Sequence, residues 1–224
     1  MKARIAILAA LPRELRPLVR DWPVQTHSRK AGFMIAECEH AIAVCAGMGR
    51  ERVTRALELA EGRGSLSEIL SVGYAGALRE GLRKLQGYWP SVVIDARTGE
   101  RYTCPEGSGT LVTMDRVVGA NEKPLVAARW NADLVDMEAA TVARLARMRG
   151  LRFRALRVVS DEAGDRLPEM NGFTDARGGF REAAFAAYIA LRPWLLPVAF
   201  RMGRNAAQGS RTLAQILRKV IGTD

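Results

Sequence analysis

The chain has 224 residues, of which 48% are apolar, which is enough to bury one hydrophobic core, so a single domain is expected. Its apolar stretches are broken well before the roughly 20 residues that span a bilayer, and no signal peptide precedes the first predicted strand, which argues against a membrane-spanning or secreted protein and predicts a cytoplasmic location. The net charge of +10 indicates either an anionic partner, such as phosphate, nucleic acid or lipid, or only a well-solvated surface.

The cysteines predict neither disulfides nor a metal site. Cys38, Cys45 and Cys104 are odd in number, and they have no metal-ligand spacing with each other or with the two histidines. We therefore expect ordinary reduced thiols and no bound metal.

The first half of the chain alternates between strand and helix patterns. It predicts a strand over 3–10, one or two strands over 35–46, a helix over 50–61, and a strand over 69–72 that ends in a turn at Gly73 to Gly76. The helix is predicted because its apolar residues recur at helical spacing, at Val53, Ala56, Leu57 and Ala60.

The second half continues the alternation. It predicts short strands over 92–95 and 110–113, a helix over 123–130, a strand ending at Asp136, a helix over 138–149 and a strand over 153–160. Such an order predicts a single-domain, three-layer α/β/α fold with a central mixed, largely parallel sheet, occupying residues 1–191.

Residues 192–224 are predicted to form a basic, amphipathic, helical tail that is part of this domain or packed on it. One helical stripe carries Leu213, Ile216, Leu217 and Val220, and the only acidic residue is Asp224. A basic amphipathic helix with a tryptophan can lie in a membrane interface. It can equally pack its apolar stripe on its own domain and leave the arginines in water.

Carboxylates follow two consecutive predicted strands. The segment Asp136-Met137-Glu138 turns directly into a helix, and the next strand ends on Ser160-Asp161. Active sites of α/β folds are built at the carboxyl ends of strands, so these acids are predicted to face one ligand. The alternative is a turn or helix-capping aspartate and a first-turn glutamate beside a core methionine.

These blocks resemble the Met-Glu-Ala-Ala and Ser-Asp signatures of the superfamily of nucleoside phosphorylases and methylthioadenosine/S-adenosylhomocysteine nucleosidases. The first strand with its trailing Glu14 is similar to the opening of that family, and two glycine-rich segments, 46–49 and 71–78, resemble its glycine turns. The motifs occur in the order that the family has. The resemblance implies purine N-ribosidic cleavage without a metal or organic cofactor, with inorganic phosphate as the only candidate co-substrate.

The resemblance also implies roles for individual residues. Asp161 would be the general acid that gives a proton to purine N7, for which burial should favour its protonated form. Glu138 would accept the ribose 2′ and 3′ hydroxyls. Glu14 would activate the attacking water. The other substrate-binding positions implied by the resemblance are Met137, Ser160, Gly76, Val117 and Val118.

Phosphorolysis remains open beside hydrolysis. Gly49, Arg50 and Arg52 could bind a phosphate at a helix start, although surface arginines are common for other reasons. Tyr74 replaces a small hydroxyl residue of many relatives, which weakens the usual phosphate or ribose contact there. We therefore favour hydrolysis with Glu14 as the base.

The short span 76–138 and the tail resemble the hopanoid-associated phosphorylase branch, whose expected task is removal of adenine from adenosylhopane. The substrate would then be a purine nucleoside, lipid-linked at the 5′ position, and the protein would touch the inner membrane face peripherally. Members assemble as dimers or rings, so a homo-oligomer is expected. The alternative is a non-catalytic nucleoside- or nucleic-acid-binding protein, but aromatics are only 6%, so no nucleic-acid partner is expected.

Overall fold

The computed structural model describes residues 3–28, 33–45, 47, 49–165, 172, 188, 191 and 196–222. Its strands are β1 (Arg4–Ala9), β2 (Val24–Ser28), β3 (Phe33–Glu37), β4 (Ala41–Cys45), β5 (Leu66–Ala77), β6 (Gly87–Tyr88), β7 (Val92–Asp95), β8 (Arg101–Thr103), β9 (Thr110–Thr113), β10 (Leu134–Asp136) and β11 (Arg152–Asp161). Its helices are α1 (Pro12–Val19), α2 (Arg50–Glu61), α3 (Lys123–Trp130), α4 (Ala139–Met148) and α6 (Leu196–Ile221).

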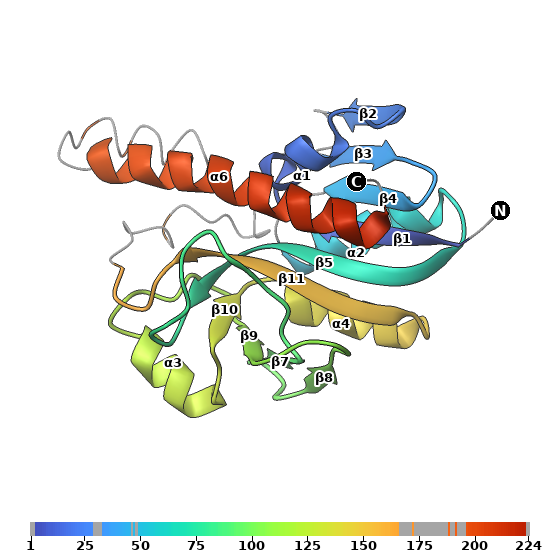
Figure 1. Ribbon diagram of the computed structural model, residues 1–224. Helices are drawn as coiled ribbons and strands as arrows, with labels where there is room; N and C mark the ends of the chain where they lie inside the picture. The colour runs from blue at the N-terminus through green and yellow to red at the C-terminus, as the bar shows by residue number, and fades with distance from the viewer. Residues whose placement is uncertain are drawn as a thin grey trace.

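The strands form one mixed sheet in the order β2-β3-β4-β1-β5-β10-β9-β7-β8, and β11 pairs with β5 and β6. The central strands β4, β1, β5 and β11 run parallel to one another, whereas the pairings of β2 with β3, β3 with β4, β6 with β11, β8 with β7 and β10 with β5 are antiparallel. Helices cover both faces of the sheet (Figure 1). The predicted three-layer α/β fold is confirmed.

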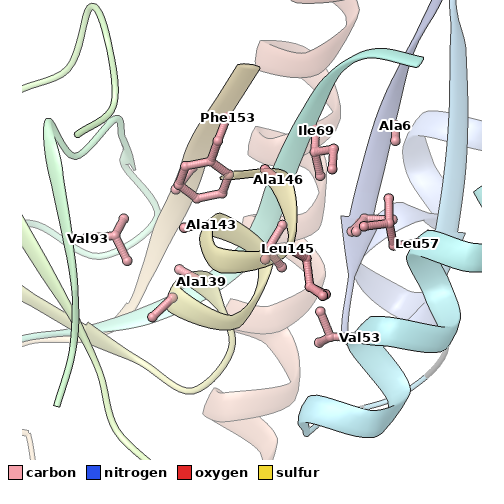
Figure 2. Close-up of a cluster of buried hydrophobic side chains, with 14 of the residues drawn as sticks. Ala6, Val53, Leu57, Ile69, Val93, Ala139, Ala143, Leu145, Ala146 and Phe153 are labelled. Carbon is pink, nitrogen blue, oxygen red and sulfur yellow. The ribbon is translucent and has the colours of Figure 1, made fainter. Parts of the chain in front are cut away.

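The sheet separates two apolar layers because side chains alternate along a strand. On β1, Ala6 and Leu8 pack with α2 and α4, whereas Ile7 and Ala9 pack with α1 and α6. Figure 2 shows the first layer, where the alanines of α4 lie close to Phe153 of β11 and α2 brings in Leu57. The alanines let α4 approach the sheet closely, which fixes the strand ends next to its first turn.

The strand predicted over 69–72 was placed too short, and the turn predicted at Gly73 to Gly76 is wrong. β5 continues through both glycines to Ala77, with Gly73 opposite Arg157 and Tyr74 opposite Val158 in the parallel pairing with β11. Glycine inside a strand commonly marks a place where another group approaches the backbone closely, and here two carboxylates do so.

The helix α1 was not predicted, because Pro12 and Pro17 lie within it. Proline is tolerated in the first turn, but Pro17 removes a hydrogen bond from the helix interior. Packing compensates for this loss, since Leu15 and Leu18 are buried among the side chains of β1, β4 and α6. Tertiary contacts thus outweigh local preference here.

The C-terminal helix is longer than the helical stripe of the sequence indicated. α6 begins at Leu196, and its last turns bury Leu213, Leu217 and Ile221 on the domain, where Arg218 Nη2 donates to Pro17 O at 2.7 Å. Its first half extends past α1 (Figure 1), with Phe200 73% exposed. Residues 192–195 of the expected tail lie outside the described residues. Within the described part, no helix is long and apolar enough to cross a membrane.

Candidate active site

A cavity of about 490 Å³ opens where β1, β5, β10 and β11 end. The three acids that the sequence singled out, Glu14, Glu138 and Asp161, all line it. The remaining residues expected to bind a substrate also lie in its wall, namely Gly76, Val117, Val118, Met137 and Ser160. The fold therefore brings segments from the whole length of the chain to one cavity, at the sheet edge where α/β folds place ligands.

Asp161 reaches the cavity because β11 has a bulge at Ser160. Val159 pairs with Ala75 and Asp161 with Gly76, so the intervening residue has no partner on β5 and the strand is re-aimed. A Cβ atom on Gly76 would lie 3.0 Å from Asp161 Oδ2, so the glycine leaves room for the carboxylate. Ser160 Oγ donates to Asp161 Oδ1 at 2.5 Å, and a lysine donates to the other oxygen.

Glu14 lies on the buried side of α1, immediately after β1. Its Oε2 accepts a hydrogen bond from the Leu11 amide at 2.8 Å, which fixes the side chain at the start of the helix. A Cβ on Gly73 would lie 3.1 Å from Oε1, so this glycine also leaves space for a carboxylate. Burial raises the pKa of Glu14, against the lowering effects of the Leu11 amide and of Arg157. A raised pKa suits a group that must take a proton from water near neutral pH.

Arg157 and Asp136 form a buried ion pair beneath these acids. Arg157 Nη2 lies 2.6 Å and Nε 3.0 Å from Asp136 Oδ2, and the guanidinium also donates to Ser71 O and Ser71 Oγ at 2.8 Å. Asp136 further accepts from Thr113 Oγ1 at 2.6 Å and from the Ala139 amide at 2.9 Å. These contacts occupy its carboxylate, so Asp136 supports the strand end and the start of α4.

The role of Arg157 was not predicted from the sequence. The signal was present, because an arginine stands in the middle of the apolar run Ala155-Leu156-Arg157-Val158-Val159. A charged residue in a strand buried on both faces needs a buried partner.

Glu138 precedes the first residue of α4 and faces the cavity. Burial and, next, the negative charge of Asp136 raise its pKa to about 8, against the lowering effect of Arg157. The free site therefore holds Glu138 largely as the acid at neutral pH. A ligand that donates hydrogen bonds to this group would favour its ionised form.

Glu138→Gln is expected to flatten the dependence of the free energy of unfolding on pH. The folded pKa of about 8 lies above the ordinary 4.5, so the folded chain binds this proton more tightly than the unfolded chain. This stabilisation is complete below pH 4.5 and is lost as the pH rises to about 8. Urea unfolding across this window should show a steeper loss of stability for the native chain than for the variant. Glu39→Gln, at a side chain that is 84% exposed, is the control, and parallel curves for all three proteins would contradict the prediction.

The candidate phosphate-binding residues lie elsewhere. Gly49, Arg50 and Arg52 are not among the described residues that line the cavity. Arg50 Nη2 lies 3.3 Å from Asp95 Oδ2, and the side chain of Arg52 packs against Gly47. The arginines in the described cavity wall are Arg13 and Arg116, and Arg116 is paired with Glu122 at 2.6 Å.

Tyr74 does not point its hydroxyl into the cavity as a small hydroxyl residue could. Its oxygen lies 2.6 Å from Ala206 O and 2.6 Å from Ser210 Oγ, so it ties β5 to α6. Gly209 makes this possible, because a Cβ there would lie 2.8 Å from the tyrosine ring.

Lys123 is the second residue that the sequence analysis missed, where it was only the first residue of a predicted helix. Its side chain is 1% exposed, and its Nζ lies 2.6 Å from Asp161 Oδ2 and 2.5 Å from Glu162 O. Local sequence gave no signal for this contact, because 38 residues separate the two partners.

Comparisons with known proteins agree with this geometry. The model of the phosphorylase superfamily matches residues 91–192, in agreement with the resemblance that the motifs indicated. No curated protein matches the sequence.

Solved structures share the fold over the whole chain. The 5′-methylthioadenosine nucleosidase of Arabidopsis thaliana has a TM-score of 0.71 at 16% identity, covering 98% of this chain and 95% of that one. The futalosine hydrolase of Helicobacter pylori has 0.69 at 16%, covering 98% and 97%. The 5′-methylthioadenosine/S-adenosyl homocysteine nucleosidase of Campylobacter jejuni has 0.69 at 16%, covering 97% and 98%.

Proposed function

Because residues 91–192 match the model of the phosphorylase superfamily, we propose that this protein cleaves the N-ribosidic bond of a purine nucleoside, releasing adenine by attack of water. The observation that carries the proposal is the meeting of Glu14, Glu138 and Asp161 in one cavity. Its volume of about 490 Å³ lies in the range of small-molecule sites. The names of the structural neighbours, which are nucleosidases and a hydrolase, support the same reaction class.

Each carboxyl group has a separate task in this reaction. As the bond between C1′ and the base nitrogen breaks, its electron pair moves into the purine, and Asp161 gives the base a proton. Glu138 accepts the ribose hydroxyls and favours the positive charge that develops on the sugar. Water adds to C1′ and gives its proton to Glu14. The products are adenine and the free sugar, as in other glycosyl cleavages that need only placed carboxyl groups.

Hydrolysis is favoured over phosphorolysis by the charges in the cavity wall. A dianionic phosphate beside Glu14 would meet a carboxylate, and Arg50 is already paired with Asp95. The raised pKa of Glu14 suits a base for water. Arg13 is the arginine in the described wall that would serve the alternative, in which phosphate attacks and a ribose 1-phosphate derivative is formed.

Glu14→Gln tests the choice of acceptor. The amide keeps the size of the side chain but cannot take a proton, so adenine release should fall by about 10²-fold or more in phosphate-free buffer. The initial rate is measured with and without inorganic phosphate. Glu51→Gln, on an exposed position of α2, is a matched control. A variant that retains full activity would remove Glu14 from water activation.

We propose that the substrate carries a 5′ substituent, and that this substituent is large and apolar, as in adenosylhopane of hopanoid biosynthesis. Leu11 and three residues of α6, Gly203, Asn205 and Ala206, also line the cavity, and none of them is charged. The exposed Phe200 lies on the same helix, one turn away. These features support an open end that can hold a long group.

Two further expectations accompany this substrate. A lipid-linked nucleoside would bring the protein to a membrane surface, and exposed Arg204, one helical turn from exposed Phe200, supports peripheral contact with anionic lipid. We also expect a homo-oligomer in solution. Flotation with anionic phospholipid vesicles and light scattering test these points separately from catalysis.

The deciding experiment measures adenine release from 5′-methylthioadenosine, S-adenosylhomocysteine and a lipid-tailed adenosine, each with and without phosphate. Phosphate-independent release supports the proposal, and preference for the lipid-tailed compound supports the open end. Release that requires phosphate would establish phosphorolysis. Binding of these nucleosides without any release would favour the non-catalytic alternative.

A further inference from the structure

Lys123 lies behind the proposed general acid, outside the cavity wall. Its Nζ donates to Asp161 Oδ2 at 2.6 Å and to Glu162 O at 2.5 Å, and Lys123 is 1% exposed. Ser160 Oγ holds the other carboxylate oxygen at 2.5 Å. Asp161 thus lines the cavity, and a buried ammonium group that does not line the cavity contacts its carboxylate.

The fold gains little from the Lys123–Asp161 ion pair as a whole. Lys123 is the first residue of α3, where the helix dipole disfavours a positive charge. Removing an ammonium and a carboxylate from water costs several kcal/mol per ion, and well-packed apolar residues in such places are often as stable or more so. A pair that stability alone does not require, placed at a cavity, is a candidate for chemistry.

The neighbouring charges are engaged with one another. Lys84 Nζ lies 2.8 Å from Asp165 Oδ2, and Arg116 Nη2 lies 2.6 Å from Glu122 Oε1. Glu162 accepts from the Lys84 amide at 3.3 Å, and Glu138 shares the cavity with Asp161. Among the described side chains, the one cation in contact with Asp161 is Lys123.

We propose that Lys123 is the positioning residue of the general acid and supplies, through Asp161, the proton that the departing base takes up. This inference rests on the proposed nucleosidase function. As the bond to the base breaks, the Lys123 ammonium gives a proton to the Asp161 carboxylate and becomes a neutral amine, and Asp161 passes a proton on to a base nitrogen. Water restores that proton after adenine leaves. The helix dipole at α3 favours the neutral amine and so assists the transfer.

The pair explains how Asp161, in ionic contact with a cation, can still give a proton to the departing base. An unassisted aspartic acid loses its proton at roughly pH 4, so alone it would hold little at neutral pH. The ammonium group of Lys123, in contact with Asp161 Oδ2, supplies the proton that the carboxylate lacks.

The test compares Lys123→Met, Lys123→Arg and the control Lys84→Met, which removes a lysine–aspartate pair from the same region without touching Asp161. The kcat for the best nucleoside of the substrate panel is measured across pH, and thermal melts establish that each variant is folded. The kcat of Lys123→Met should be about 10²-fold below that of the native chain at alkaline pH. At acid pH it should be within about 10-fold of the native value, because solvent can then protonate Asp161. Lys123→Arg keeps the positive charge, but the guanidinium does not give up its proton, so the kcat of this variant should be low at every pH.

Other results would overturn the inference. A purely structural lysine predicts a loss in Lys123→Met that is the same at all pH values and a near-normal Lys123→Arg. As a second readout, 4-nitrophenyl riboside has a leaving group that needs little protonation, so Lys123→Met should cleave it nearly as fast as the native chain does. Equal losses on both substrates would contradict proton supply. Failure of the native chain to cleave any nucleoside would instead reject the proposed function itself.

Discussion

Asp161→Asn is expected to lower adenine release by about 10²- to 10⁴-fold at neutral pH, the range that general acid catalysis contributes. The amide cannot give a proton to the departing base, although its oxygen can still accept from Lys123 at the position now held by Oδ2. The carboxylate site on β11 would thus keep its geometry and lose its acid. Steady-state release of adenine from the best nucleoside of the panel measures the effect.

Asp165→Asn is the matched control for this substitution. It makes the same chemical change four positions further on, where Asp165 is paired with Lys84 and does not line the cavity. Its kcat should remain within about 3-fold of that of the native chain. If Asp161→Asn and Asp165→Asn have similar rates, Asp161 is not the acid.

Arg157→Met is expected to lower the free energy of unfolding by about 3–5 kcal/mol, the cost of removing one partner from a buried ion pair. The substitution leaves Asp136 buried with its negative charge uncompensated and removes both donors to Ser71. It also removes the positive charge that lowers the pKa values of Glu14 and Glu138. Urea unfolding at pH 7 measures the loss.

A double variant distinguishes the loss of the ion pair from a general loss of packing. Asp136→Leu combined with Arg157→Met removes both charges, and replacement of a whole buried pair by apolar groups is often neutral, so much of the lost stability should return. Arg149→Met, in a surface pair with Glu61, should cost less than about 1 kcal/mol. A similar loss for Arg149→Met and Arg157→Met would contradict the assigned role of the buried pair.

Elements with strong local patterns were predicted well from the sequence. α2 spans Arg50–Glu61 as its helical spacing indicated, and the strand ends at Asp136 and Asp161 fall where the carboxylates marked them. Glu138 and Asp161 were predicted because carboxylates follow two consecutive predicted strands, and Glu14 was predicted because the first strand resembles the opening of the family.

What the sequence could not give depends on contacts between distant segments. β5 was cut short because Gly73 and Gly76 resemble a turn locally, whereas the carboxylates that fill their space come from α1 and β11. α1 was missed because its prolines oppose a helix and its packing compensates. The role of Lys123 was not predicted because it depends on a contact with Asp161, which lies on another element.

The anchoring of α6 has a consequence for how such a protein can diversify. The carboxyl groups to which we assign the reaction lie on α1, β11 and the start of α4, whereas α6 contributes Gly203, Asn205 and Ala206 to the cavity wall. Tyr74 fastens that helix through Ala206 O and Ser210 Oγ, which are backbone and side-chain contacts that leave the side chain of Asn205 free to vary. During evolution, substitutions in this part of the wall can therefore change the range of compounds that the cavity accepts, while the carboxyl groups assigned to the reaction stay the same.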